Sequence, residues 1–499
     1  MHNKQTNIKN CVKSGIKRLS MSNFSQYTQA SPQYTQANAL YTQPGAQQIS
    51  IKLTLLMLLS LASLLLNVTA FAQDQLGNPV QISAPQVVFG DVQSFQVSPD
   101  GSRVVYVADQ NTDGVFELFS VPTAGGTAVR LNPNLVNNGG VSSVFQFSPD
   151  GSRVVYIADQ NTDGVNELFS VPTAGGTAVR LNSNLVSGGD VFRFEISPDS
   201  SRVVYQATQT NNVVELFSVP IADGTGTAVR LNSTLVTGGS LSSFQISPDG
   251  SRVVYTADQN TDGVIELFSV PIGGGTAVRL NPNLVSGGDI SFNPNFQISP
   301  DGSRVVYVAD QITDGVNELF SVPIIGGSAV RLNSNLVTGG SLSSFQISPD
   351  GSRVVYNADQ ITDGVPELFS VPIAGGTAVR LNPDLDNNNA VFSLRISPDS
   401  SRVAYTAGEF SIGIGLIDEL FSVPIAGGTV ERVNDTLPFS ADVGTFEFSP
   451  NSQFIIYIAD QNVFDENELF SVALPQPAPD ETQFFVIPLP NGGAAVIPL

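Results

Sequence analysis

The chain has 499 residues, of which 41% are hydrophobic and only 13% are charged, so it is long and apolar enough to bury a large core. Its only histidine (His2), its only cysteine (Cys11) and all of its lysines precede residue 53, whereas the stretch from Gln73 onward carries 16 arginines against all 44 acidic residues, a formal charge of −28. In that stretch the composition excludes a disulfide, a Ser-His-Asp triad, a thiolate or Schiff-base catalyst and the usual zinc ligands, and it disfavours binding to nucleic acid.

The first 72 residues read as a disordered, basic segment followed by a signal peptide. Residues 1–50 are polar and basic, and Leu53–Leu66 is an apolar run directly after Lys52. That run is short for a membrane-spanning helix, which needs about 20 residues, and Ala70-Phe71-Ala72 has the small-x-small pattern of a cleavage site. We expect cleavage after Ala72, which leaves no membrane span. An uncleaved anchor is the alternative.

Residues 73–475 consist of eight sequence repeats. The tripeptide Ser-Pro-Asp recurs at intervals of 49 to 52 residues, and an eighth, degenerate copy begins at Ser449. The seven intact copies begin at Ser98, Ser148, Ser197, Ser247, Ser299, Ser348 and Ser397.

Each repeat contains four short runs that are typical of β-strands. In the fourth repeat these runs are Phe244–Ile246, Arg252–Ala257, Glu266–Pro271 and Thr276–Leu280, and each is bounded by Gly, Pro, Asn or Asp. No stretch shows sustained helical periodicity. Four antiparallel strands in each repeat predict an all-β fold, an eight-bladed β-propeller of four-stranded antiparallel blades.

The two ends of the repeat region indicate how the ring closes. Residues 76–100 align without a gap to residues 175–199, so Pro79–Ile82 takes the place of a fourth strand that precedes the first blade. The last repeat has only its first three strands. We therefore expect the N-terminal strand to complete the eighth blade, with Val80 near Phe470, and so to remove an exposed sheet edge.

Residues 476–499 are a Pro-rich linker and a predicted β-hairpin. Phe484–Leu489 and Ala494–Leu499 flank the turn-forming residues Pro490–Gly493. Because proline cannot donate to a strand ladder, both segments are expected at a sheet edge. In an alternative arrangement, Phe484–Leu489 is the fourth strand of the eighth blade.

The sequence Ser-Pro-Asp-Gly-Ser-Arg-Val-Val-Tyr at Ser98–Tyr106, with its copies, resembles the TolB-like propeller family with Pro-Asp repeats. It is also similar to the propellers of prolyl-oligopeptidase-type enzymes. The resemblance covers roughly residues 76–475, and it implies protein–protein binding in the cell envelope. The hydrolase chemistry of some relatives is not expected, because no histidine follows His2.

Residues that recur in every repeat are interpreted as structural. The aspartate of Ser-Pro-Asp is expected to accept hydrogen bonds from turn amides. The arginine that begins each second strand, such as Arg103, is predicted to pair with carboxylates between blades. Tyr106 and Phe119, with their equivalents, are predicted core residues.

The loop between the second and third strands has the pattern of a calcium-binding loop. Three copies read Asp-Gln-Asn-Thr-Asp-Gly-Val-x-Glu, which supplies carboxylates at positions 1, 5 and 9 and an amide oxygen at position 3. The candidate Ca²⁺ ligands are Asp109, Asn111, Asp113, Glu117, Asp159, Asn161, Asp163, Glu167, Asp258, Asn260, Asp262 and Glu266. A metal-free β-turn is the alternative, because Asp, Asn and Gly also build such turns. Two further copies have Ile312 and Ile361 at position 3.

A partner surface is expected where the repeats diverge. The seventh repeat replaces the acidic loop with a longer, apolar one, and the next connection between repeats is also atypical. Exposed apolar residues of this kind often mark an interface. The candidate partner-binding residues are Phe410, Ile412, Ile414, Leu416 and Phe439. Packing of these loops on each other is the alternative.

The sequence favours an exported, monomeric, non-enzymatic propeller that acts as a protein-interaction scaffold and is stabilised by Ca²⁺. Its location would be periplasmic, cell-surface or extracellular, and its partner a protein or another component of the cell envelope. One alternative is a lactonase-like propeller hydrolase with a central Ca²⁺, although Glu195 and Glu447 are the only acids in the innermost strand row. A second alternative is a structural cell-surface repeat protein.

Overall fold

The structure is a computed structural model that describes residues 79–499 except 211, 223–227, 292–295, 386–388, 412–414, 439–440, 463–465, 476–483, 489–493 and 499. It describes only the backbone at residues 210, 389, 409–411, 415–417, 484–488 and 494–498. The chain divides into two units, Met1–Val80 and Gln81–Leu499, and all described strands belong to the second. The predicted signal peptide lies outside the described residues. Where the chain is described, none of it forms a helix with the length and apolar character that a membrane crossing requires.

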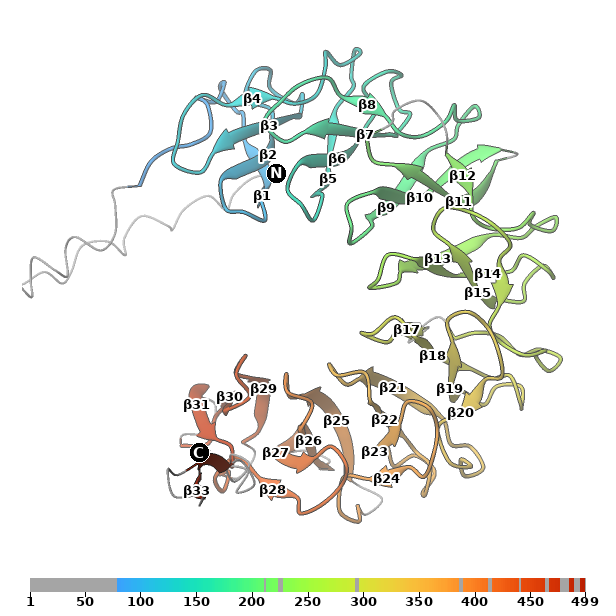
Figure 1. Ribbon diagram of the computed structural model, residues 1–499, viewed down its shortest axis with the longest axis vertical. Coiled ribbons are helices and arrows are strands. Elements are labelled where there is room, and N and C mark those ends of the chain that lie inside the picture. Colours follow the sequence, from blue (N-terminus) through green and yellow to red (C-terminus); the bar gives the residue numbers. More distant parts are fainter. Residues whose placement is uncertain are drawn as a thin grey trace, which may run out of the picture. The chain divides into compact units, whose positions relative to one another are not determined.

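The described strands of the second unit form a series of small antiparallel sheets in chain order (Figure 1). Each of the first seven sheets has four strands, and each is called a blade here, numbered along the chain. Blades one to four are β1 (Val92–Val97), β2 (Arg103–Ala108), β3 (Glu117–Pro122) and β4 (Val129–Arg130); β5 (Val141–Phe147), β6 (Arg153–Ala158), β7 (Glu167–Pro172) and β8 (Val179–Arg180); β9 (Val191–Ile196), β10 (Arg202–Thr210), β11 (Val213–Pro220) and β12 (Val229–Arg230); and β13 (Leu241–Ile246), β14 (Arg252–Ala257), β15 (Glu266–Pro271) and β16 (Val278–Arg279).

The later sheets follow the same order. Blades five to seven are β17 (Phe296–Ile298), β18 (Arg304–Ala309), β19 (Glu318–Pro323) and β20 (Val330–Arg331); β21 (Leu342–Ile347), β22 (Arg353–Ala358), β23 (Glu367–Pro372) and β24 (Val379–Arg380); and β25 (Asn389–Ile396), β26 (Arg402–Ser411), β27 (Gly415–Pro424) and β28 (Glu431–Arg432). Blade eight has three described strands, β29 (Val443–Phe448), β30 (Phe454–Ala459) and β31 (Glu468–Ala473). A separate two-stranded sheet contains β32 (Phe484–Pro488) and β33 (Ala494–Pro498). The eight predicted β-sheet repeats are therefore confirmed.

The register within a blade brings aromatic side chains into one row. In blade four, Phe244 lies opposite Tyr255, and Tyr255 lies opposite Phe268. The Tyr–Phe pair stacks with ring centroids 5.3 Å apart, an arrangement that recurs in all eight blades. The fourth strand is shorter than predicted, because only Val278 and Arg279 pair with β15.

The apolar core lies between successive blades rather than within each one. The cluster that contains Val105, Val107 and Leu118 of blade one also contains Phe145 and Tyr156 of blade two. Equivalent clusters join each later pair of neighbouring blades. Because both faces of a sheet are covered, its central strands read as continuous apolar runs rather than as alternating ones.

The Ser-Pro-Asp turn closes the first hairpin of blades one to seven through its aspartate, as predicted, and in blade eight Asn451 takes this place. In blade one the Asp100 carboxylate accepts hydrogen bonds from the Ser98 hydroxyl (2.6 Å) and from the Ser102 amide (3.0 Å). These donors, the Ser98 hydroxyl foremost, lower the pKa of Asp100 to about 2. The carboxylate therefore stays ionised at acidic pH, and it continues to accept these hydrogen bonds there.

The arginine that begins the second strand of blades one to seven does not pair with a carboxylate of another blade, so that prediction is wrong. Arg103 Nε donates to the Ser120 hydroxyl (2.8 Å) on β3 of the same blade, and Arg153 does the same with Ser170 (2.6 Å). The cause is the strand register, which places each arginine near the serine of its own sheet.

The turn between strands three and four requires glycine at one position, because the turn lies close to the preceding blade there. Gly175 has a φ of +101°, and a Cβ built on it would lie 2.9 Å from Cγ1 of Val129 in the preceding blade. A side chain at this position would therefore be strained and would also collide with the neighbouring blade. The Gly-Gly turn of one blade is thus fitted to the fourth strand of the blade before it.

The segment that precedes blade one repeats the connection seen between successive blades. Ile82 packs against the apolar cluster of blade one, as Leu181 packs in the cluster between blades two and three. The Gly90 amide donates to the Val87 carbonyl at 2.9 Å, a bond also seen at the equivalent glycine of the second connection. The gap-free sequence alignment is therefore reflected in the structure from Ile82 onward.

Two apolar faces that are buried elsewhere are exposed in the first and last blades. Phe95 of blade one is 68% exposed, whereas its equivalent in blade two, Phe145, is buried. Leu469 of blade eight is 72% exposed, whereas its equivalent in blade one, Leu118, is buried. Within the described part of the chain, no strand pairs with Val80. Closure by the N-terminal strand remains a prediction, and these are the faces that it would cover.

The predicted C-terminal hairpin is confirmed by the backbone. β32 pairs with β33 in antiparallel fashion, with Phe485 opposite Ile497 and Val486 opposite Val496. The alternative in which this segment forms the fourth strand of blade eight is not what the structure shows, because β32 pairs with β33 in a sheet of its own.

Ring closure can be tested by a disulfide, because the chain after Gln73 has no native cysteine. Val129 lies opposite Ser120 in blade one, so closure would place Val80 opposite Ser471 in the same way. We expect Val80→Cys with Ser471→Cys to form a disulfide under mild oxidation, because directly opposed residues have Cβ atoms within bonding range. Faster migration on non-reducing gels, with mass spectrometry of the linked peptides, measures it.

The control is the pair Ser120→Cys and Val129→Cys, which must form its disulfide whether or not the ring closes. If the control pair forms its disulfide while the cysteines at positions 80 and 471 stay reduced, closure by the N-terminal strand is contradicted.

Candidate functional site

The loop between strands two and three is held by the aspartate at its first position. In blade one, Asp109 Oδ2 accepts the Gly114 amide (2.9 Å) within the loop, and Oδ1 accepts the Asp91 amide (2.5 Å) from the segment before the blade. Gly114 has a φ of +76°, as the sharp reversal requires. The same carboxylate thus closes the loop and ties it to the preceding connection.

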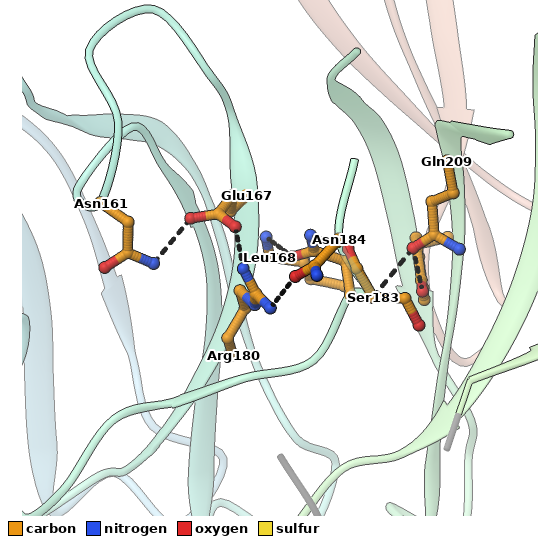
Figure 2. A network of polar contacts seen from close by, with 9 residues as sticks. Asn161, Glu167, Leu168, Arg180, Ser183, Asn184 and Gln209 are labelled. Carbon is orange, nitrogen blue, oxygen red and sulfur yellow. Dashed lines mark hydrogen bonds and ion pairs between the residues drawn. The ribbon is translucent and has the colours of Figure 1, made fainter. Parts of the chain in front are cut away.

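The asparagine and glutamate of the loop take part in an ion-paired network with strand four, shown for blade two in Figure 2. Asn161 Nδ2 donates to Glu167 Oε2 (2.6 Å), and Arg180 Nη1 donates to Glu167 Oε1 (2.7 Å). Arg180 Nη2 also donates to Asn184 Oδ1 (2.7 Å). The buried glutamate therefore has both of its oxygens occupied by protein donors, which compensates the cost of burying its charge.

Figure 2 also shows a polar contact between blades. The Gln209 side-chain oxygen in blade three accepts the Ser183 amide (3.0 Å) from the connection that leaves blade two. The same oxygen accepts the Tyr205 hydroxyl (2.9 Å). One amide side chain thus fixes a connection to the next blade and satisfies a buried tyrosine.

The aspartate at position 5 of the loop lies apart from the other candidate ligands. In blade four, a Cβ built on Gly238 would lie 2.6 Å from Oδ1 of Asp262, so this carboxylate rests against the connection from blade three. Asp163 is likewise near the side chain of Asn138 in the preceding connection (3.4 Å). Position 5 therefore faces the preceding connection, whereas positions 3 and 9 bond to each other.

In this conformation the loop residues do not fit a calcium ion. The carboxylate at position 1 is bonded to amides, the one at position 9 is paired with arginine, and the one at position 5 is turned aside. Across the part of the chain that the structure describes, no three His, Cys, Asp or Glu side chains gather as a metal ion would need. Calcium binding stays a prediction, and it would require these hydrogen bonds to be exchanged for metal ligands.

The isoleucine copies show what the asparagine at position 3 does. In blades five and six, where Ile312 and Ile361 replace it, Oε2 of Glu318 and of Glu367 is buried without a hydrogen-bond partner. Each of these glutamates keeps its arginine through Oε1. The asparagine is therefore a donor to a buried glutamate, a role that explains its repetition without a metal.

The predicted partner-binding residues belong to an extension of blade seven. β26 and β27 are longer than their counterparts, and Phe410 pairs with Leu416 across this extension. The segment predicted as a loop is thus largely a continued hairpin. Of the predicted set, Ile412, Ile414 and Phe439 lie outside the described residues, and the side chains of Phe410 and Leu416 are not described. The structure therefore does not test whether they form one patch.

Polar side chains on the innermost strands form contacts between blades. Gln96 Nε2 donates to the Phe145 carbonyl of blade two (2.8 Å), and Glu195 Oε2 accepts the Ile246 amide of blade four (3.2 Å). Arg193 lies over the Phe244 ring at 4.9 Å and pairs with Glu195. Of the two acids that the hydrolase alternative would use, Glu195 is engaged in these contacts.

Sequence reasoning missed the Glu–Arg–Asn network, although the repeats contain its signal. The glutamate that begins strand three and the arginine of strand four recur together, as in the pairs Glu117–Arg130 and Glu266–Arg279. Blade eight has Glu468 but no such arginine, and Oε2 of this half-buried glutamate has no partner. The recurrence of the glutamate and arginine together in blades one to seven was the available clue.

Comparison with known proteins supports the propeller architecture. A family model described as the lipoprotein LpqB β-propeller domain matches residues 146–260. The match covers less than half of the chain, and it supports the predicted β-propeller fold. No curated protein sequence matches the chain.

Solved structures with a similar arrangement have low identity to this chain. TolB from Acinetobacter baumannii is 17% identical, with 55% of this chain and 62% of that one covered and a TM-score of 0.27. Dipeptidyl peptidase 4 from Porphyromonas gingivalis is 11% identical, with 73% and 55% covered and a TM-score of 0.46. Oligogalacturonate lyase from Vibrio parahaemolyticus is 14% identical, with 78% and 99% covered and a TM-score of 0.37.

The role of the asparagine predicts that Ile312→Asn combined with Ile361→Asn stabilises the protein. Each new amide would donate to a buried carboxylate oxygen that now lacks a partner, a gain of about 1 kcal/mol per site. We expect the melting temperature to rise by about 2–4 °C. Differential scanning calorimetry measures it.

The matched control is Ile312→Asp with Ile361→Asp, because aspartate has the shape of asparagine without its donor. If the Asp and Asn variants melt alike, the proposed hydrogen bond is not the cause of any change.

Calcium binding is tested by melting the protein in chelator and in millimolar Ca²⁺. Because Arg and amide donors already satisfy the loop carboxylates, we expect chelation to leave the melting temperature unchanged. A rise in Ca²⁺ that chelator reverses would show that the ion displaces these donors. Asn161→Ile, which removes one predicted ligand in blade two, should then reduce the rise.

Proposed function

We propose that the chain is an exported, non-enzymatic β-propeller that acts as a protein-interaction scaffold in the cell envelope. The observation that supports this most is the use of the repeated polar groups. The turn aspartates, the loop glutamates and the innermost glutamines are bonded within or between blades, as at Asp100, Glu167 and Gln96. Groups engaged in this way are poorly placed to act on a substrate.

The proposed contact region is the extended hairpin of blade seven. It is where the described structure departs furthest from the other blades, because β26 and β27 each have 10 residues and the equivalent strands of blade one have 6. Its apolar residues Phe410, Ile412, Ile414 and Leu416, with Phe439 of the next connection, are proposed to anchor a protein partner.

The acidic surface indicates the charge of that partner. The mature stretch carries a formal charge of −28, and the charges of Asp310, Asp258 and Asp314 add to burial in raising the pKa of Asp289 between blades four and five. A basic partner would be attracted to such a surface, and its association would weaken with salt.

The location and the cofactor are proposals of the same kind. An envelope location is supported by the export signal in the sequence and by the name of the matching family, a lipoprotein domain. Calcium is proposed only as an ion that would have to displace the present hydrogen bonds in the loops of blades one, two and four, so we expect no calcium requirement for stability. The hydrolase alternative has less support, because the inner polar row is engaged between blades.

The scaffold proposal is tested by affinity capture from envelope extracts of the producing organism. We expect wild-type protein to retain a specific partner, and Phe410→Ser with Ile414→Ser to reduce that retention at least about tenfold without lowering the melting temperature.

The control is Ile312→Ser with Ile361→Ser, which removes exposed apolar side chains from the equivalent loops of blades five and six. Equal capture by all three proteins would contradict the proposed contact region. Capture of nothing by the wild type would favour a structural surface protein.

A further inference from the structure

A buried carboxylate without a hydrogen-bond partner lies at the junction of blades seven and eight. Asp418, on β27, is only 7% exposed, and its Oδ1 accepts no hydrogen bond. The residue opposite it on β26 is Gly408, which has no side chain to offer a donor. A buried, unpaired carboxylate of this kind is costly when ionised.

The position is special among the blades. The residue that precedes the strand-three glutamate is Phe116 in blade one, Asn166 in blade two and Ile265 in blade four. The other blades have Val214, Asn317, Pro366 and Asn467 at this position. Asp418 is therefore the one acidic residue among the eight equivalents. Blade seven is therefore the one repeat with a carboxylate immediately before the strand-three glutamate.

A second carboxylate comes from that connection. At the equivalent place in blades two and four, the amides of Asn166 and Ile265 donate to a connection aspartate, Asp190 or Asp289. Asp442 holds this place between blades seven and eight. Its own amide donates to Asp460 Oδ1 (2.7 Å), at the end of β30. The connection therefore places Asp442 near both Asp418 and Asp460.

The surrounding charges do not relieve the repulsion. Asp442, in the connection, lies near Asp418. Asp460, at the end of β30, lies near Asp442. On β27 itself, Glu419 pairs with Arg432 of β28 (2.8 Å), so that arginine is engaged. On β26 the adjacent acid, Glu409, is described only by its backbone. Among the described residues, no arginine forms a salt bridge with Asp418 or Asp442. Burial, with a smaller effect of Asp442, raises the pKa of Asp418 to about 7.

We propose that Asp418 binds a proton at the junction of blades seven and eight, and that this pair of carboxyl groups makes the junction sensitive to pH near neutrality. The proton removes one charge from a buried site, so the native protein holds a proton that the unfolded chain has released. Stability must then fall as pH rises from the ordinary aspartate range to about 7, and it levels off above that. Lower pH therefore stabilises this junction.

The junction adjoins the proposed contact region, because β27 continues from Asp418 into the extended hairpin. Ionisation would therefore loosen the base of that hairpin. Any effect on partner binding rests on the proposed function, whereas the effect on stability does not. The stability experiment alone tests the proton site.

The test compares the melting temperature of the wild type with that of Asp418→Asn between pH 4.5 and pH 8, with chelator present. Asparagine has the shape of the protonated acid, so we expect equal melting temperatures at pH 4.5 and a variant that melts about 2–4 °C higher at pH 8. Asp442→Asn should show a smaller gain in the same direction, because it removes only the repulsive charge.

Asp113→Asn, at an exposed loop position in blade one, is the control and should shift the melting temperature equally at both pH values. Hydrogen exchange of Val443–Phe448 at pH 5.5 and pH 8, expressed as protection relative to the intrinsic exchange rate at each pH, gives a second measurement. We expect lower protection at pH 8 than at pH 5.5 in the wild type but not in Asp418→Asn. Parallel pH profiles for the wild type and Asp418→Asn, in both measurements, would overturn the proposal.

Discussion

Each four-stranded sheet of this protein has two apolar faces, and it can bury neither of them by itself. Val105 and Leu118 of blade one reach the same cluster as Phe145 and Tyr156 of blade two, so every described cluster between blades depends on both neighbours. Burial of such side chains stabilises by roughly 1.5–3 kcal/mol each, which is large beside the net stability of a domain. The stacking of sheets is therefore the condition for the fold, and Phe95 and Leu469, whose equivalents in other blades are buried, are exposed in the first and last blades.

The polar side chains of the repeat serve the same stacking. Three kinds of side chain provide hydrogen-bond partners for polar groups that would otherwise have none. They are the turn aspartate, the loop glutamate with its arginine, and the glutamine after strand two. The loop of blade two illustrates the dependence, because Glu167 is buried and relies on Asn161 and Arg180 for its two oxygens. A pattern that resembles a metal-binding loop is thus accounted for by the needs of one buried carboxylate.

Divergence from the repeat has two kinds of consequence. Where isoleucine replaces the loop asparagine, as at Ile312, the fold is kept and one carboxylate oxygen loses its donor. Where blade seven departs, new features arise together: a longer hairpin, an acid at Asp418, and an adjoining connection that carries Asp442. The first kind weakens a common contact, whereas the second creates a place with properties that no other blade has.

The sequence by itself determined the number of sheets, their strand order, the tight turns and the core aromatic residues, because these follow from local patterns that recur along the chain. The spacing of Ser-Pro-Asp and the apolar runs such as Arg252–Ala257 required no knowledge of distant contacts. Only the tertiary structure decided the partners of the charged residues. Arg103 bonds to a serine of its own sheet rather than to a carboxylate of another, and Glu117 is paired with Arg130 instead of being free for a metal ion. The reason is physical: strand register and burial select which donor reaches which acceptor, and both arise from contacts between strands that the linear pattern does not contain.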